Sequence, residues 1–193
     1  MTYRIFIVSI LFFTPFYGVS PFLEYARTTL LRGNNPVHHA LFHNDRIKNV
    51  LLGLIEAEKQ SITIAIYSLT DADIAQALIE KQRQNVLVRV VMDHALAVDS
   101  SWTKARILVR HGIPVFLFPP NKNASAKMHN KFALFAKNLN DKRLVWTGSY
   151  NFSRAASYSN EENVVVLENN LVYQAYMLYF ESLKRQAKLL HIS

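Results

Sequence analysis

The stretch "SITIAIYSLTDADIAQALIEKQRQNVLVRVVMD", residues 61–93, decides the fold. Its first eight residues are mostly apolar and β-branched, which predicts a buried strand, and "VLVRVVMD" at its end predicts a second one. Between them, Thr70 or Asp71 can cap a helix that runs to about Gln84, with Ile74 on its apolar face. Two strands separated by a helix of this length indicate parallel neighbours in one sheet.

The same kinds of pattern continue on both sides of this stretch. Residues 129–135 and 143–149 are joined by a polar turn at 136–142, which predicts a hairpin in the same sheet. We therefore predict an α/β domain over residues 37–193, one per chain, with a mixed β-sheet flanked by helices on both faces. The remaining strands are expected at 37–43, 113–118 and 163–168, and the remaining helices at 44–60, 100–111 and 171–190.

Composition limits the function classes. With 193 residues, of which 50% are hydrophobic and 19% charged, the chain is neither disordered nor a polytopic membrane protein. It has no cysteine, which excludes disulfides, thiolate nucleophiles and Cys-based metal sites. The net charge of +8 favours a polyanionic partner, either nucleic acid or an anionic bilayer surface, although charge that only serves solubility is the alternative.

The N-terminal residues differ from the rest of the chain. Arg4 precedes an uncharged apolar run, Ile5–Phe13, and small residues follow at Gly18 and Ser20. This pattern predicts that residues 1–20 are a signal peptide or an N-terminal membrane anchor, and residues 21–36 a tether. We therefore expect export to the periplasm or medium, or membrane anchoring. A buried N-terminal element of the domain is the alternative.

Four polar groups are spaced as if to converge on one point. On the expected strand, His129 and Lys131 lie two residues apart and so share a face. Ser149 and Asn151 follow Gly148, which permits a turn and a close approach of backbone to ligand. An imidazole, an ammonium, a hydroxyl and an amide together provide a nucleophile and three donors for phosphate oxygens.

A phosphodiester needs its charge neutralised before a nucleophile can approach. Residues 127–152 contain a single carboxylate, Asp141, so we expect Lys131 to replace the usual divalent metal ion, with no cofactor. A neutral imidazole also needs an acceptor that fixes its tautomer, and Glu162, just before "NVVVL", is the candidate. The alternative is an ordinary hairpin with a polar face.

The pattern H-x-K, then G-S-x-N, then E-N-V resembles the HKD motif of the phospholipase D superfamily. A single motif on a short chain is most similar to the branch that contains small bacterial endonucleases and mitochondrial cardiolipin hydrolase. The resemblance runs from about Leu41 to the C-terminus and implies a phospholipase D-like fold.

The resemblance also implies a role for each motif residue. His129 would form a phosphohistidine intermediate, and Lys131 would bind the phosphate together with Ser149 and Asn151, while Glu162 would orient His129. Single-motif members of the superfamily form homodimers, so a second His129 would protonate the leaving oxygen, a step that this chain needs because it has no second His-x-Lys.

Three functions remain open, and one departure from the motif is the reason for the third. The superfamily has an Asp where this chain has Ala136, and Asp141 or Asn138 in the longer turn are the possible substitutes. We expect a non-specific endonuclease acting on DNA or RNA, with phospholipid (cardiolipin) hydrolysis at a membrane as the second reading. A catalytically weakened relative that binds nucleic acid or lipid is the third.

The remaining polar and aromatic residues have simpler expected roles. We interpret His38, His39 and His43 as surface residues in preference to a metal site, and Asp93 with His94 as a cap where a strand ends. Lys122 and Lys127 flank the motif and either contact neighbouring phosphates or are solvated. Three aromatic residues are expected in the core, not as base-stacking surfaces: Trp102, Phe116 and Phe118.

Overall fold

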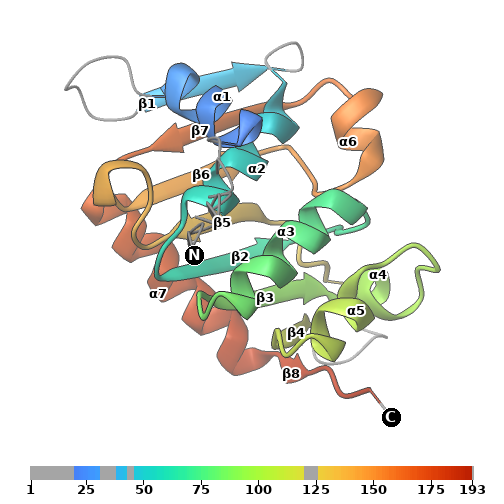
Figure 1. The fold of residues 1–193 in the computed structure, drawn as a ribbon. Helices are drawn as coiled ribbons and strands as arrows, with labels where there is room; N and C mark the ends of the chain where they lie inside the picture. Colours follow the sequence, from blue (N-terminus) through green and yellow to red (C-terminus); the bar gives the residue numbers. More distant parts are fainter. Residues whose placement is uncertain (1–19, 31–37, 43–45, 120–125, 193) are drawn as a thin grey trace, which may run out of the picture.

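The computed structural model describes residues 20–30, 38–42, 46–119 and 126–192, and within these ranges it contains one mixed sheet (Figure 1). The strand order is β1-β7-β6-β5-β2-β3-β4-β8, in which β2, β3 and β4 run parallel and the other neighbours are antiparallel. The strands are β1 (His38–Phe42), β2 (Ser61–Ile66), β3 (Leu87–Asp93), β4 (Val115–Phe118), β5 (Lys131–Phe135), β6 (Leu144–Gly148), β7 (Asn163–Leu167) and β8 (Lys188–Leu189).

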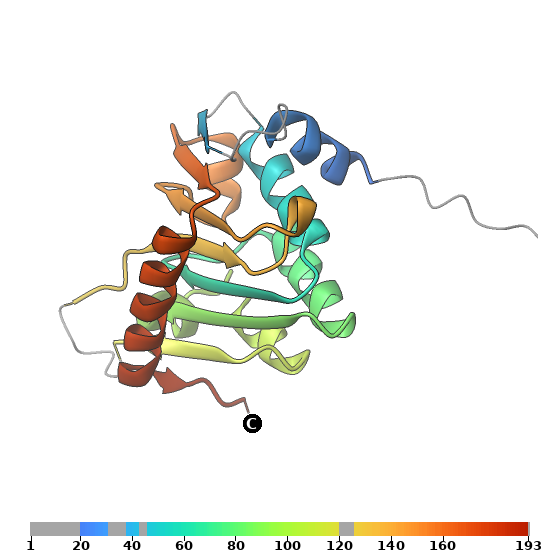
Figure 2. The ribbon, with the colours of Figure 1, turned by 90° about the vertical axis from the view of Figure 1, so that its left-hand side faces the viewer.

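Helices cover both faces of the sheet, as predicted. Figure 2 shows α7 along one face and α1, α2 and α3 along the other. The described helices are α1 (Pro21–Leu30), α2 (Ile47–Ala57), α3 (Ala72–Arg83), α4 (His94–Val98), α5 (Ala105–Arg110), α6 (Arg154–Tyr158) and α7 (Asn170–Gln186), with a 3-10 turn at Leu139–Asp141.

Each face has its own apolar cluster. Because successive strand residues point to opposite faces, Phe132 and Leu134 of β5 pack with Phe180 of α7, while Ala133 and Phe135 pack with the larger cluster under α2 and α3. All five side chains are buried. The sheet is therefore sandwiched between two hydrophobic layers, which explains why its central strands are apolar throughout.

The helix between the parallel strands begins where the sequence predicted. The N-cap of α3 is Asp71, not Thr70: its carboxylate accepts hydrogen bonds from the backbone N–H groups of Asp73 (2.9 Å) and Ile74 (3.1 Å). The same carboxylate forms an ion pair with Lys48 of α2 at 2.8 Å. Asp71 thus fixes both the start of α3 and its position beside α2.

Of the two segments predicted at the N-terminal side, one differs in the structure and the other lies almost wholly outside the described residues. Residues 21–30, predicted as part of a tether, form α1, which buries Ala26 and Leu30. Gly53 of α2 allows this packing, because a Cβ there would overlap the carbonyl oxygen of Phe22. The predicted signal peptide or anchor at 1–20 lies outside the described residues except for Ser20. Among the described helices, none has the length and apolar character needed to span a bilayer.

Two further predictions were wrong in detail. The helix expected at 100–111 is shorter, since only α5 (105–110) lies there, and a second short helix, α4, precedes it because Asp93 caps α4 immediately after β3 by accepting from Leu96 N (3.3 Å). The C-terminal helix ends at Gln186 and not at 190, because Ala187 adopts an extended conformation and the chain then pairs with β4 as β8. The short β8 was not predicted, and it adds an outer strand to the sheet next to β4.

The turn between β5 and β6 is organised by one buried carboxylate. Glu58, which is fully buried, accepts hydrogen bonds from the backbone N–H groups of Gln60 (2.9 Å), Ser61 (3.0 Å) and Lys137 (2.8 Å). It also accepts one from the side-chain amide of Asn138 (3.1 Å). Glu58 therefore ties the end of α2 to the start of β2 and to the hairpin turn.

We predict that Glu58→Ala destabilises the fold by about 3 kcal/mol, because it leaves several buried donors without an acceptor. Urea unfolding followed by circular dichroism measures the change. The control is Glu80→Ala, which removes an exposed ion pair with Arg83 and should cost less than about 1 kcal/mol. Equal effects of the two substitutions would show that Glu58 does not organise the turn.

Candidate active site

The predicted site residues come together along one side of the sheet. This side is an edge formed by strand ends, not by an outer strand. Strand β5 lies between β2 and β6 and runs antiparallel to both, so its N-terminal end lies beside their C-terminal ends. In Figure 1 this is the edge where the arrowheads of β2 and β3 end, on the side of α4 and α6. His129 and Lys131 approach from β5, Ser149 and Asn151 follow β6, and Glu162 precedes β7.

His129 rests against a buried lysine. The Nζ of Lys131 lies 3.1 Å from both imidazole nitrogens of His129 and donates to its carbonyl oxygen at 2.9 Å. Lys131 is only 8% exposed, whereas His129 is exposed. His129 is not on the strand as predicted but two residues before its start, where Asn130 O accepts a hydrogen bond from Tyr67 N at 2.9 Å.

Tyr67 is a site residue that the sequence analysis missed. Its ring centroid lies 4.5 Å from that of His129, with the planes tilted by 56°, and the Lys131 Nζ lies 4.9 Å from the Tyr67 centroid. A tyrosine face attracts a cation at this distance. Its position in the sequence could have indicated this role, because Tyr67 is the first residue after the carboxyl end of the buried strand β2.

Ser149 and Glu162 form a hydrogen-bonded pair. Ser149 Oγ donates to Glu162 Oε2 and accepts from Asn163 N at 3.0 Å, while Asn160 Nδ2 donates to Glu162 Oε1 at 3.1 Å. Glu162 is buried, and within the described structure no hydrogen bond joins it to His129. Its side-chain hydrogen bonds are thus with Ser149 and Asn160, not with the imidazole as predicted.

Asn151 joins two loops at the same edge. Its side-chain oxygen accepts from Ser68 N at 3.2 Å, and the next residue, Phe152, donates its N–H to Ser68 O at 3.1 Å. Gly148 is required here for close packing, because a Cβ would overlap the carbonyl oxygen of Asn163. The Asn151 amide nitrogen has no partner within the described part of the chain and remains able to donate.

Asp93 anchors the chain just before His129. Its Oδ2 accepts from Met128 N at 3.0 Å, and its Oδ1 caps α4. The expected cap is therefore confirmed, and the carboxylate has a second role in holding the approach to β5. His94 Nδ1 lies 3.0 Å from Pro119 O.

The substitutes considered for the missing aspartate lie at the other end of β5. Ala136 follows β5 and packs partly buried against the α7 cluster. Asn138 is buried and bonds Leu54 O at 2.8 Å as well as Glu58, while the exposed Asp141 pairs with Lys59 at 2.8 Å. Because β5 spans five residues, roughly 16 Å, none of these positions reaches His129.

Several secondary predictions have mixed outcomes. Among the described residues no group of three His, Asp or Glu side chains is placed to hold a metal ion. His39 is half-buried on β1, and both His43 and Lys122 lie outside the described residues. Lys127 is exposed. Phe116 and Phe118 pack against the α7 cluster as expected, but the prediction for Trp102 was wrong, since it is 76% exposed.

The comparisons with known proteins agree with this fold. A family model described as cardiolipin synthase, phospholipase D-like domain, matches residues 51–184. A phospholipase D from Rickettsia conorii is 32% identical over 123 residues, covering 64% of this chain and 56% of the relative. The mitochondrial cardiolipin hydrolase of Xenopus laevis is 29% identical over 146 residues, covering 73% of this chain and 62% of the relative.

Two solved structures have the same architecture. Nuc from Salmonella typhimurium, a phospholipase D family member, matches with a TM-score of 0.70 at 24% identity, covering 82% of this chain and all of Nuc. NucT from Helicobacter pylori matches with a TM-score of 0.69 at 22% identity, covering 79% of this chain and 98% of NucT. The family match spans most of the chain, so the chain belongs to the phospholipase D-like family.

Burial lowers the pKa of Lys131 below its usual range, and the Glu162 carboxylate partly opposes this by favouring the charged form. We predict that Lys131 loses its proton at a lower pH than an ordinary lysine, so the pocket loses its cation as the pH rises through that value. Titration of lysine ¹³Cε signals by NMR measures this, with Lys131→Arg assigning the resonance. Titration at or above the ordinary lysine value would contradict the burial argument.

Proposed function

We propose that this protein is a metal-independent phosphodiesterase. The observation that carries the proposal is the exposed imidazole of His129 held at 3.1 Å from the buried ammonium of Lys131, at the edge where Ser149 and Asn151 also lie. A nucleophile beside a fixed cation and two further donors is the arrangement that phosphoryl transfer needs.

The first chemical step follows from the chemistry of these groups. The Lys131 ammonium, 3.1 Å from the ring nitrogens of His129, can donate to one of them when the imidazole is neutral, and the attack proposed here uses that neutral form. A bound phosphodiester would draw the Lys131 ammonium onto its non-bridging oxygens, with Ser149 and Asn151 as further donors. The freed His129 nitrogen then attacks phosphorus, the bond to the leaving oxygen breaks, and water later hydrolyses the phosphohistidine.

Glu162 is proposed to act in the same step. In the described structure its two oxygens accept from Ser149 and Asn160. If Ser149 turns its hydroxyl to the substrate phosphate, one carboxylate oxygen becomes available to orient His129 and to stabilise the positive charge that develops on its ring. The buried Glu162 also keeps a negative charge near Lys131, which favours the ammonium form.

The leaving oxygen needs a proton, and a second copy of the chain is the proposed source. The sequence has one His-x-Lys, and His129 is exposed at the sheet edge, so a two-fold axis near it would bring two imidazoles to one phosphate. Sedimentation should show a dimer. An active enzyme that stays strictly monomeric at assay concentration would contradict the paired-histidine arrangement.

Nucleic acid is the leading proposed substrate. The net charge of +8 and the fold shared with Nuc and NucT support a non-specific endonuclease that binds the backbone of DNA or RNA. The similarity to mitochondrial cardiolipin hydrolase supports phospholipid hydrolysis as the second candidate. The third candidate, a non-catalytic binding module, was suggested by Ala136 in place of the motif aspartate. Its support is weaker because β5 separates Ala136 from His129.

The proposed location follows from the N-terminal segment. The uncharged run Ile5–Phe13 after Arg4 is the feature that supports export or membrane tethering of the domain. Either location would place the enzyme where extracellular nucleic acid or a bilayer surface is accessible.

Plasmid DNA and labelled cardiolipin, each incubated with the full chain in excess EDTA, test activity and substrate together. We predict plasmid nicking that persists in EDTA, falls by at least about 1000-fold in His129→Ala because the nucleophile is lost, and weakens steeply with salt. His39→Ala, on β1, is the matched control and should retain activity. Lipid turnover without nicking would favour the second candidate, and binding without either activity the third.

A further inference from the structure

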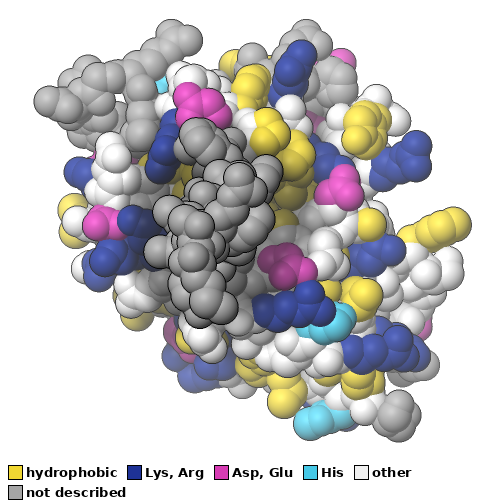
Figure 3. All heavy atoms as spheres, in the orientation of Figure 1, with side chains coloured by type: hydrophobic (Ala, Val, Ile, Leu, Met, Phe, Trp, Pro, Cys, Tyr) yellow, Lys and Arg dark blue, Asp and Glu magenta, His cyan; other side chains and the backbone are white. Residues whose placement is uncertain are grey.

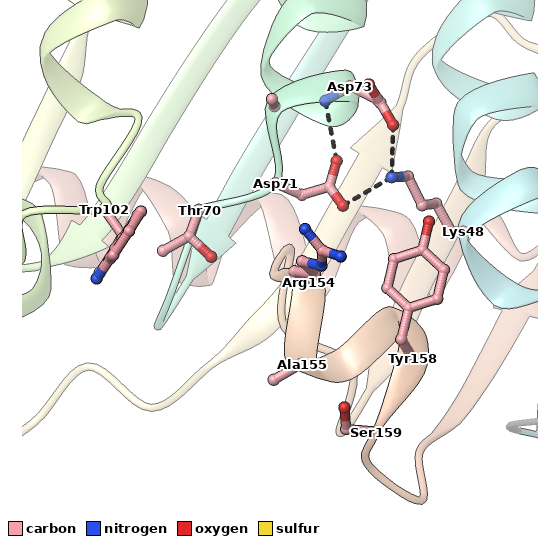
Figure 4. Close-up of a pocket in the computed structure, with 10 residues that line it drawn as sticks. Lys48, Thr70, Asp71, Asp73, Trp102, Arg154, Ala155, Tyr158 and Ser159 are labelled. Carbon is pink, nitrogen blue, oxygen red and sulfur yellow. Dashed lines mark hydrogen bonds and ion pairs between the residues drawn. The ribbon is translucent and has the colours of Figure 1, made fainter.

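A second feature lies beside the candidate active site. It is an open groove of about 1040 Å³ between the N-terminal end of α3, the loop after α4 and helix α6. Figure 4 shows Trp102 and Tyr158 on opposite sides of it, with Thr70 and Arg154 between them. None of these residues has a role in the proposed chemistry.

The two aromatic side chains of the groove are open to solvent. Trp102 is 76% exposed and Tyr158 is 65% exposed, so neither contributes much to the core. Aromatic rings that face a groove provide stacking surfaces for the bases of an unpaired strand, and such stacking tolerates any sequence because every base has a π-face.

The cations of the groove differ in how they are held. Lys48 pairs with Asp71 at 2.8 Å and with Asp73 at 2.7 Å, and although burial opposes it, these carboxylates raise the pKa of Lys48. Arg154 forms no ion pair within the part of the chain that the structure describes, and its guanidinium lies 5.9 Å from the Tyr158 centroid. Arg154 is therefore available to bind an added phosphate, whereas Lys48 is already neutralised.

The groove and the site are built from the same two chain segments. Leu69 and Phe152 form a parallel bridge, and Thr70 N donates to Phe152 O at 2.9 Å, so residues 68–71 lie beside residues 151–152. At one end these segments carry the contacts of the site, and at the other they line the groove. Asn151 and Arg154 are three residues apart, so their Cα atoms lie at most about 11 Å from each other, and one bound strand of a few nucleotides can reach both.

We propose that this groove holds the unpaired nucleotides on one side of the scissile phosphate, with a base stacked on Trp102 and a backbone phosphate on Arg154. The inference rests on the proposed phosphodiesterase function and specifies its substrate as single-stranded nucleic acid. In a duplex each base face is covered by its neighbours, so only an unpaired base can use the Trp102 ring. A phospholipid headgroup has no such face.

The test compares a 12-nucleotide single strand of thymidine with bis(p-nitrophenyl) phosphate, a diester too small to fill the groove. For Trp102→Ala and Arg154→Gln, we expect the ratio of kcat/KM for the oligonucleotide to that for the small diester to fall about tenfold. Trp102→Phe should restore most of the ratio. The matched controls, Leu178→Ala and Arg185→Gln, change exposed residues of α7 on the other face of the sheet and should keep the wild-type ratio.

Tryptophan fluorescence gives a second readout that needs no turnover. The chain has two tryptophans, of which Trp146 is buried, so binding of the oligonucleotide to His129→Ala should quench emission from Trp102, and Trp102→Phe should abolish the quenching.

An unchanged ratio with no quenching overturns the groove proposal even if the enzyme cleaves DNA. Quenching by phosphatidylglycerol vesicles alone, or loss of dimer in Trp102→Ala, also overturns it. Failure of the wild type to hydrolyse either substrate overturns the phosphodiesterase instead, while the quenching still tests the groove.

Discussion

The antiparallel placement of β5 between β2 and β6 is the constraint on which the site depends. Parallel strands alone would bring only their carboxyl ends to one edge, but a reversed central strand brings the start of β5 to that same edge. His129, just before β5, thereby contacts Tyr67 after β2, and Ser149 follows β6 on the same side of the sheet. The pairing of β6 with β7 then adds Glu162. Residues 83 positions apart in the chain, Ser68 and Asn151, thus become neighbours.

This arrangement buries the Lys131 ammonium, and the groups around it explain how the fold tolerates a buried charge. Lys131 loses hydration at the edge of the sheet, but its ammonium donates to His129, faces the Tyr67 ring and feels the charge of Glu162. Such a cation is already largely desolvated and lies beside the proposed nucleophile. In the proposed mechanism it has only to shift from His129 to the phosphate oxygens, with little water to displace.

The sequence predicted the parts of the fold that follow from local pattern. The strands at residues 61–66 and 87–93 and the helix capped by Asp71 are visible in hydrophobicity and capping chemistry alone. The closeness of His129 and Lys131 was also predictable, because residues two positions apart in an extended segment share a face. Glu162 bonds Ser149 and Asn160 in the structure, and not His129 as the sequence had suggested.

The rest depends on tertiary contacts that no local pattern contains. The ring of Tyr67 against His129 and the bond from Met128 to Asp93 both join segments more than 30 residues apart. The exposure of Trp102 contradicts its hydrophobic character, and only the groove beside it gives a reason. The sequence alone could not show whether Ala136, in place of the motif aspartate, affects catalysis. The structure places Ala136 at the C-terminal end of β5, whereas His129 lies before its N-terminal end.

The central claim is that these strand ends hold an imidazole ready to take a phosphoryl group, and the most direct measurement is to trap that intermediate. Protein quenched in alkali during turnover of a diester substrate can be digested and analysed by mass spectrometry. The account predicts an acid-labile phosphoryl adduct on the peptide that contains His129, absent from His129→Ala. Cleavage with no adduct during turnover, or with the adduct on another residue, would contradict it.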